Sequence, residues 1–138
     1  MRLMGIDFGD ARVGIALSDP LMIMSQGYKT ILNDGTDSLF EEIASIIKEK
    51  EVTKIIIGLP KNMDNSQGFR TDATMEFAQK LKTFTDVEID FSDERLTTVS
   101  AHGFLNEMNV KGKKRKGAVD TLSAALILET YMKKNGLL

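Results

Sequence analysis

Three short strands in succession open this chain, and the pattern places no helix before the third strand ends. Residues 2–8 form an apolar run, and residues 12–18 alternate apolar with small side chains after a Gly-Asp turn, which predicts a hairpin. Residues 23–32 supply a third strand, which ends at the turn signal Asn33-Asp34-Gly35. The fold therefore begins with three antiparallel strands, and every later element has to pack against them.

Helical and strand patterns alternate over the rest of the chain. The expected elements are a helix from Thr36 or Asp37 to about Lys50, a buried strand at 53–57, a helix at about 70–83 with Met75, Ala78 and Leu81 inward, a strand at 87–91, a helix from about Thr97 and a last helix from about Ala118 to Lys134. We predict an α/β fold in which two parallel strands extend the antiparallel three into a mixed five-stranded sheet, with helices on both faces. From the length of 138 residues we expect one domain, over 1–138.

The composition excludes several kinds of site. The chain has no cysteine and one histidine, His102. A thiolate zinc site, a cysteine nucleophile and any site with two histidine ligands are therefore excluded. The longest apolar runs are too short to span a bilayer, and the N-terminus lacks a signal-peptide pattern. We expect a cytoplasmic protein without a membrane partner.

Three acidic residues stand where a metal site is plausible. Asp7 interrupts the apolar first strand, where burying a carboxylate is costly unless it is paired or coordinates a cation. Glu94 follows the last strand, and Asp120 lies on the apolar stripe of the last helix. Magnesium prefers such oxygen ligands, and paired ions can activate a water against a phosphodiester. Structural roles compete with this interpretation: Asp120 opposes a helix dipole, and Glu94 can pair with Arg95.

One short segment concentrates positive charge in a chain whose net charge is −2. Its basic residues are Lys111, Lys113, Lys114, Arg115 and Lys116. The flanking glycines, Gly112 and Gly117, predict a mobile loop rather than a packed helix. Five cations beside an acidic site favour binding to a phosphate backbone, since neutralised phosphates release counterions. The competing interpretation is a solvated charged loop.

Four motifs in order resemble the YqgF family, whose members are described as Holliday junction resolvases or pre-ribosomal-RNA nucleases of the ribonuclease H-like superfamily. The first motif is GIDFG at residues 5–9 with RVGIA at 12–16, and the second is GLP at 58–60 with Arg70. The third is DERLTT at 93–98, and the fourth is the basic segment with VD at 119–120 and AALIL at 124–128. The resemblance covers essentially the whole chain.

The resemblance implies a ribonuclease H-like fold and a metal site formed by Asp7, Glu94 and Asp120, which would bind Mg²⁺ or Mn²⁺ and carry catalysis. It also implies that Arg12, the loop at 58–70 and Arg95 line the site. The residues expected to bind nucleic acid are therefore Arg12, Lys61, Arg70 and Arg95, together with the basic segment Lys111, Lys113, Lys114, Arg115 and Lys116. Asn65 and Phe69 depart from the family pattern. Ser123 stands where related bacterial resolvases have a fourth acid, and Asp93 is the nearby substitute.

The leading interpretation is a metal-dependent nuclease acting on structured RNA or branched DNA. We favour 5′-end processing of the precursor of small-subunit ribosomal RNA, with ribosomal precursor particles as partners. The alternative is resolution of Holliday junctions, which normally needs a two-fold dimer. No apolar stripe predicts such a dimer, so we expect a monomer or weak homodimer. An actin-like phosphotransfer domain and a non-catalytic nucleic-acid-binding module are two further alternatives.

Overall fold

The computed structural model describes residues 2–21, 24–59, 69–93 and 112–136, and it describes the backbone alone at 69–71, 93 and 112–120. The strands are β1 (Arg2–Phe8), β2 (Arg12–Ser18), β3 (Ser25–Leu32), β4 (Val52–Leu59) and β5 (Glu88–Asp93). The helices are α1 (Ser38–Glu49), α2 (Phe69–Leu81) and α4 (Gly112–Lys134). The helix expected from about Thr97, with His102, lies outside the described residues.

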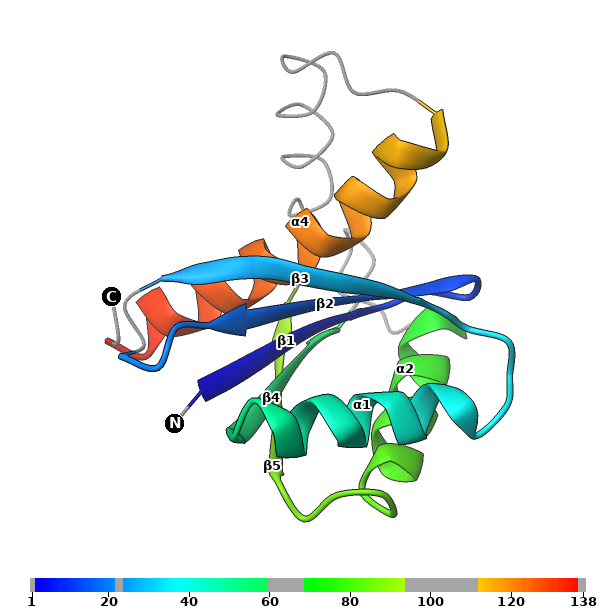
Figure 1. Cartoon of the computed structure of the whole chain (residues 1–138), viewed down its shortest axis with the longest axis horizontal. Helices are drawn as coiled ribbons and strands as arrows, with labels where there is room; N and C mark the ends of the chain where they lie inside the picture. Colours follow the sequence, from blue (N-terminus) through cyan, green and yellow to red (C-terminus); the bar gives the residue numbers. More distant parts are fainter. Residues whose placement is uncertain (1, 22–23, 60–68, 94–111, 137–138) are drawn as a thin grey trace.

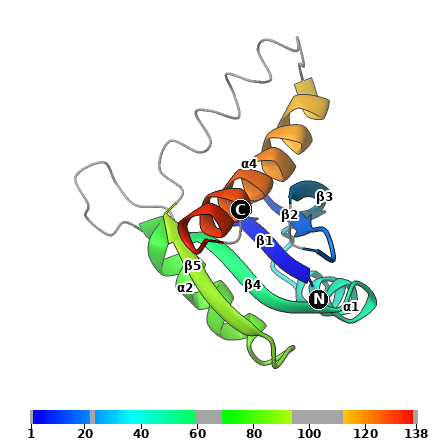
Figure 2. The same cartoon turned by 90° about the vertical axis from the view of Figure 1, so that its left-hand side faces the viewer.

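A five-stranded sheet in the order β3-β2-β1-β4-β5 forms the centre of the molecule (Figure 1). β2 pairs antiparallel with both β1 and β3, whereas β4 pairs parallel with β1, and β5 pairs parallel with β4. Figure 2 shows α4 on one face of the sheet and α1 and α2 on the other. The predicted mixed sheet with helices on both faces is confirmed.

The larger core lies between the sheet and the pair α1 and α2. The predicted apolar face of α1 is confirmed, because Leu39, Phe40, Ile43, Ile46 and Ile47 are all buried. The prediction for Met75 in α2 was wrong, since its side chain is 38% exposed. The buried face of α2 consists of residues 74, 77, 78 and 81, which follow the 3.6-residue period of a helix. Position 75 is one residue past position 74 and therefore falls outside this face.

A second core joins α4 to the opposite face of the sheet. Its buried members include Leu3, Ala16 and Ile56 from three neighbouring strands and Ala124, Ile127 and Leu128 from the helix. Gly5 permits close packing here, because a Cβ at this position would lie 2.7 Å from the carbonyl oxygen of Ala124. No helix in the described part of the chain is long and apolar enough to cross a membrane.

The start of α4 corrects the prediction of a basic loop. Residues Lys113, Lys114, Arg115 and Lys116 have helical backbone, and the helix begins at Gly112 rather than near Ala118. Lysine and arginine are good helix formers, and one interior glycine costs only about 1 kcal/mol, so the flanking glycines do not stop the helix. Lys111 lies outside the described residues. The first turns of α4 project past the sheet (Figures 1 and 2).

Candidate active site

Asp7 is the second-to-last residue of β1 and lies at the carboxyl end of the strand. It pairs with Gly14 of β2, and its side chain is half-buried. Side chains alternate along a strand, so Asp7 shares the α4 face with Gly5 and Leu3. The ring of the next residue, Phe8, stacks on Phe77 of α2 with centroids 4.5 Å apart. This stacking on the other face anchors the end of β1 that carries Asp7.

β5 leads the chain to the same edge of the sheet. Asp90 lies on the α4 face, since the hydroxyl of Tyr131 in α4 donates a hydrogen bond to its carboxylate over 2.9 Å. Ser92 is the next residue on that face and pairs with Gly58 of β4. Glu94 follows two positions later, outside the described residues. The parallel pairing therefore brings the described end of β5, at Asp93, to the edge that carries Asp7, one residue before Glu94 in the sequence.

α4 crosses its face of the sheet diagonally, and its N-terminal half lies toward the same edge. Ser25 of β3 donates a hydrogen bond to the carbonyl oxygen of Ala125 over 2.7 Å. Thr121, one helical turn earlier, faces Gly27, which is two residues further along β3. β3 and β1 run in the same direction, because both are antiparallel to β2. Ala124 packs against Gly5 of β1, and Asp120 comes one helical turn before Ala124. The backbone of α4 at Asp120 is therefore displaced from Gly5 toward the end of β1 that carries Asp7.

Arg12 lies at the same edge, across the tight turn that joins β1 to β2. The N–H of Gly9 donates to the carbonyl oxygen of Arg12 over 2.9 Å. Asn33, directly after β3, holds this turn: its side-chain N–H donates to the carbonyl oxygen of Gly9, and its backbone N–H donates to that of Ala11, each over 2.9 Å. In the sequence Asn33 is recognisable only as part of the next turn, because a contact across 24 residues leaves no local pattern.

Beside the edge, β5 and the end of α4 border a cavity of about 330 Å³ that includes Ser92, Tyr131 and Lys134. The backbone N–H of Phe91 and the Tyr131 hydroxyl both donate to Asp90 and lower the pKa of its carboxyl. Tyr131 and the nearby carboxylates of Glu88 and Asp90 raise the pKa of Lys54, whose Nζ lies 3.8 Å from Asp90. No local sequence pattern indicates this group, because its members come from three separate elements.

Several predicted residues fall outside what the structure describes. Glu94, Lys61, Arg95 and Lys111 lie outside the described ranges, and the side chains of Arg70, Asp120 and the basic residues at 113–116 are not described. Among the described side chains, no three acidic or histidine groups stand close enough together to hold a metal ion. The metal set Asp7, Glu94 and Asp120 stays a prediction. Ser123 is fully buried, so its position offers no surface ligand.

Known proteins resemble this chain in sequence over nearly its whole length. Residues 1–134 match the model of the RuvX family, described as Holliday junction resolvase. A protein of Ruminiclostridium cellulolyticum, named as a candidate pre-16S rRNA nuclease, is 46% identical over 133 residues, or 96% of this chain and 94% of the relative. A protein of Clostridioides difficile with the same name is 43% identical over 131 residues, or 95% and 93% of the two chains.

Solved structures with low sequence identity share the fold. RuvC of Thermus thermophilus in complex with a Holliday junction substrate superposes with a TM-score of 0.58 at 9% identity, over 99% of this chain and 97% of the other. The Fowlpox virus resolvase in complex with Holliday junction DNA gives a TM-score of 0.56 at 13% identity, over 98% and 99% of the two chains. The predicted ribonuclease H-like architecture is thereby confirmed.

Proposed function

The chain belongs to the RuvX family of Holliday junction resolvases, and from this membership we propose that it is a nuclease that hydrolyses phosphodiester bonds in structured nucleic acid with a divalent metal ion. The resemblance drawn from the four motifs is confirmed by this membership. The observation that carries the proposal is the convergence of β1, β5 and α4 on one edge of the sheet, with Asp7 half-buried there.

The residues at this edge fit Mg²⁺ or Mn²⁺. Asp7 offers carboxylate oxygens at a half-buried position, and the chain continues from β5 into Glu94 and along α4 through Asp120. Hard divalent cations take such oxygen ligands and retain water for catalysis. When bound, the ion activates a water for attack and stabilises charge on the leaving oxygen. Asp7, Glu94 and Asp120 are the residues that would hold it.

Basic residues are proposed to bring the polyanion to this acidic edge. Arg12 lies across the first turn from Asp7, and the helical segment at 113–116 begins the element that also carries Asp120. We assign phosphate binding to these residues together with Lys61, Arg70, Arg95 and Lys111. Because phosphate contacts position a nucleic acid without reading its sequence, these residues should affect affinity more than the cut position.

The substrate we favour is the precursor of 16S ribosomal RNA, in the cytoplasm and within ribosomal precursor particles. The support comes from relatives at 46% and 43% identity, whose names specify a pre-16S rRNA nuclease. The second candidate substrate is a four-way DNA junction, which the family description and the two junction-bound resolvases favour. We propose that the protein acts as a monomer or weak homodimer.

The deciding experiment compares cleavage of labelled precursor RNA and labelled junction DNA, each with and without Mg²⁺. Asp7→Asn keeps the shape of the side chain and removes the charge that would hold the cation. Cleavage should fall by about a hundredfold or more while the fold is retained, because losing even an outer partner of a metal ligand costs about 10–100-fold. Asp10→Asn is the matched control, because Asp10 is exposed in the adjacent turn and its loss changes the net charge equally. Full activity of purified Asp7→Asn would refute the proposal.

A further inference from the structure

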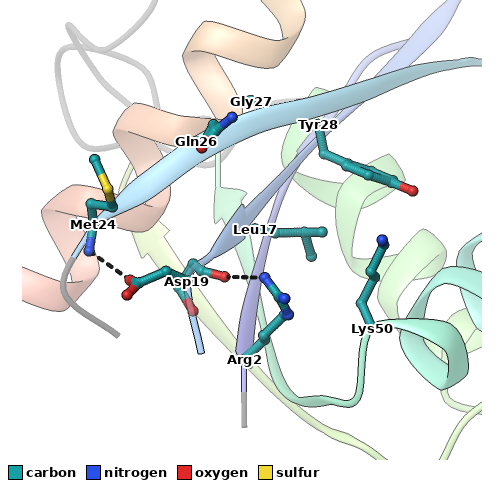
Figure 3. A pocket seen from close by; sticks show the side chains of 9 residues that line it. Arg2, Leu17, Asp19, Met24, Gln26, Gly27, Tyr28 and Lys50 are labelled. Carbon is teal, nitrogen blue, oxygen red and sulfur yellow. Dashed lines mark hydrogen bonds between the residues drawn. The ribbon is translucent and has the colours of Figure 1, made fainter. Parts of the chain in front are cut away.

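A cavity of about 180 Å³ lies at the opposite end of β1 from Asp7 (Figure 3). Arg2 at the start of β1, Tyr28 of β3 and Lys50 at the end of α1 surround it, and the buried side chain of Leu17 forms part of its wall. Asp7 is five positions further along the strand than Arg2, which is on the order of 17 Å at the usual rise per residue. The cavity is therefore separate from the candidate active site.

Three backbone irregularities surround this cavity. In the pairing of β2 with β3, Ile15 lies opposite Lys29 and Ala16 opposite Gly27, which leaves Tyr28 as the extra residue of a bulge. The pairing of β1 with β4 also shifts register, between Arg2 and Leu3. Glu51, directly after Lys50, has a φ of 56°. Bulges re-aim side chains and are frequent next to active sites, so the bulge at Tyr28 favours a binding site at this end of the sheet.

The cavity has a net positive lining. In the described part of the chain, neither Arg2 nor Lys50 forms an ion pair with a carboxylate. Arg2 donates one hydrogen bond to the carbonyl oxygen of Ser18 over 3.2 Å, which uses one of five N–H donors. Asp19 is the single acidic residue among those that line the cavity, and its carboxylate accepts the backbone N–H of Met24 over 2.9 Å. Two cations and one anion favour an anionic ligand.

An aromatic and apolar surface adjoins these cations. The ring of Tyr28 is in the lining and its residue is 42% exposed, with Nζ of Lys50 at 5.6 Å from the ring centroid. Met24, at 58% exposed, extends the apolar surface. In Figure 3, Tyr28 and Lys50 point toward one another, with Leu17 between Tyr28 and Arg2. Pockets that enclose a whole small molecule are larger, at roughly 300–1,000 Å³, so a ligand here would place one group in the cavity and lie partly against the exposed ring of Tyr28.

We propose that this cavity binds a single nucleotide, with its phosphate held by Arg2 and Lys50 and its base stacked on Tyr28. Guanidinium and ammonium groups make charge-assisted hydrogen bonds to phosphate, and bases stack on aromatic side chains with little sequence preference. The nucleotide is either a free mononucleotide or an unpaired unit of a longer RNA strand. The proposal does not depend on the nuclease function, because the cavity lies away from Asp7.

The test is a titration of the whole chain with adenosine 5′-monophosphate in the presence of EDTA, followed by amide NMR shifts and calorimetry. Shifts should cluster at Arg2, Tyr28 and Lys50, and Lys50→Ala and Tyr28→Ala should each weaken binding about tenfold. Lys48→Ala is the matched control, since Lys48 is exposed one half-turn earlier and does not line the cavity. Tyr28→Phe keeps the ring and should retain binding. Asp7→Asn should bind as the wild type does, which separates this test from that of the nuclease.

Two further titrations identify the source of the nucleotide. The first uses a single-stranded oligoadenylate of five residues. If it binds more than tenfold more tightly than the mononucleotide, with the same dependence on Lys50 and Tyr28, the site binds RNA. Equal affinities assign it to a free nucleotide. Inorganic phosphate that binds as tightly as the mononucleotide would overturn the proposal, because the base would then contribute nothing. Shifts that cluster elsewhere, no saturable binding, or binding unaltered by both alanine variants would overturn it as well.

Discussion

Gly5 of β1 packs directly against the backbone of Ala124 in α4, and a Cβ at position 5 would approach the Ala124 carbonyl oxygen to 2.7 Å and the Leu128 Cβ to 2.9 Å. Backbone atoms of a packed helix cannot turn aside as a flexible side chain can. Gly5 is two residues from Asp7, and Ala124 is one turn from Asp120. This contact therefore sets the distance between the two elements proposed to hold the metal ion.

We expect Gly5→Ala to destabilise the protein by about 1–3 kcal/mol, the usual cost of overpacking a core, and to lower metal-dependent cleavage by moving α4 away from β1. The measurements are urea denaturation and the cleavage assay. Gly27→Ala is the graded control, because its Cβ would come no nearer than 3.0 Å to Thr121 of the same helix, a milder approach than the 2.7 Å at position 5. An equal loss in both variants would show that the contact with Ala124 has no special role.

The hydrogen bond between Tyr131 and Asp90 predicts a pH effect. The Phe91 N–H and the Tyr131 hydroxyl lower the pKa of Asp90 below its ordinary value of 3.8. Tyr131→Phe removes one donor and keeps the other, so the pKa of Asp90 should rise part of the way back. A carboxyl-detected NMR titration measures this pKa, and Tyr28→Phe, which alters the chain's other tyrosine, is the control. No rise in Tyr131→Phe would contradict the prediction.

The same hydrogen bonds link stability to acid pH. A carboxyl whose pKa is lowered by folding stabilises the native state above its unfolded pKa, and this stabilisation is lost as pH falls through the folded pKa. Wild type should therefore lose more stability than Asp90→Asn when the pH falls from neutral to below 3.8. The effect should be small, because the Asp90 side chain is 49% exposed. Chemical denaturation at both pH values checks it.

Glu51 predicts a stabilising substitution. Its φ of 56° lies in the left-handed region, directly after the last turn of α1, where glycine avoids the penalty of about 1 kcal/mol that other residues incur. We expect Glu51→Gly to raise the free energy of unfolding by about 0.5 kcal/mol, after the greater entropy of an unfolded glycine is subtracted. Lys48→Gly, inside the helix, should lower it by about 0.7 kcal/mol. Thermal denaturation of the two variants distinguishes these signs.

The elements that sequence analysis placed correctly are those with a strong local pattern. The apolar period of α1 and the β-branched run in β4 indicate burial without reference to any partner. The prediction that Met75 faces inward with Ala78 and Leu81 was wrong, because residues spaced three apart drift around a helix whose period is 3.6 residues. The pairing of Tyr131 with Asp90 and the turn held by Asn33 depend on tertiary packing across 41 and 24 residues, so no local pattern could have predicted them.

The sequence likewise predicts part of the candidate site. Asp7 stands out in sequence because it interrupts an apolar strand, and the structure places it at the carboxyl edge. The basic residues from 113 to 116 also stand out, but their charge carries no information on their conformation, and the glycines at 112 and 117 do not stop the helix. The nucleotide cavity had no sequence signal, since Arg2, Tyr28 and Lys50 meet only through two strand irregularities.

The helical start of α4 changes how the basic segment should respond to mutation. We expect Lys113→Ala, Lys114→Ala and Lys116→Ala, combined in one variant, to weaken binding of precursor RNA and junction DNA alike without moving the cut. Alanine is the best helix former, so α4 should begin where it does now and thermal stability should hardly change. The slope of log affinity against log salt should become less steep by up to about one unit per lost phosphate contact.

A second triple variant tests whether the position of these charges matters. Lys48, Lys82 and Lys133 are exposed lysines on three helices or their ends, remote from the start of α4, and their replacement by alanine changes the net charge by the same amount. If the first turns of α4 contact the phosphate backbone, this control should retain most of the affinity and the steeper salt slope, because scattered charges release few counterions. Equal losses in both variants would show that net charge alone, and not the basic start of α4, attracts the nucleic acid.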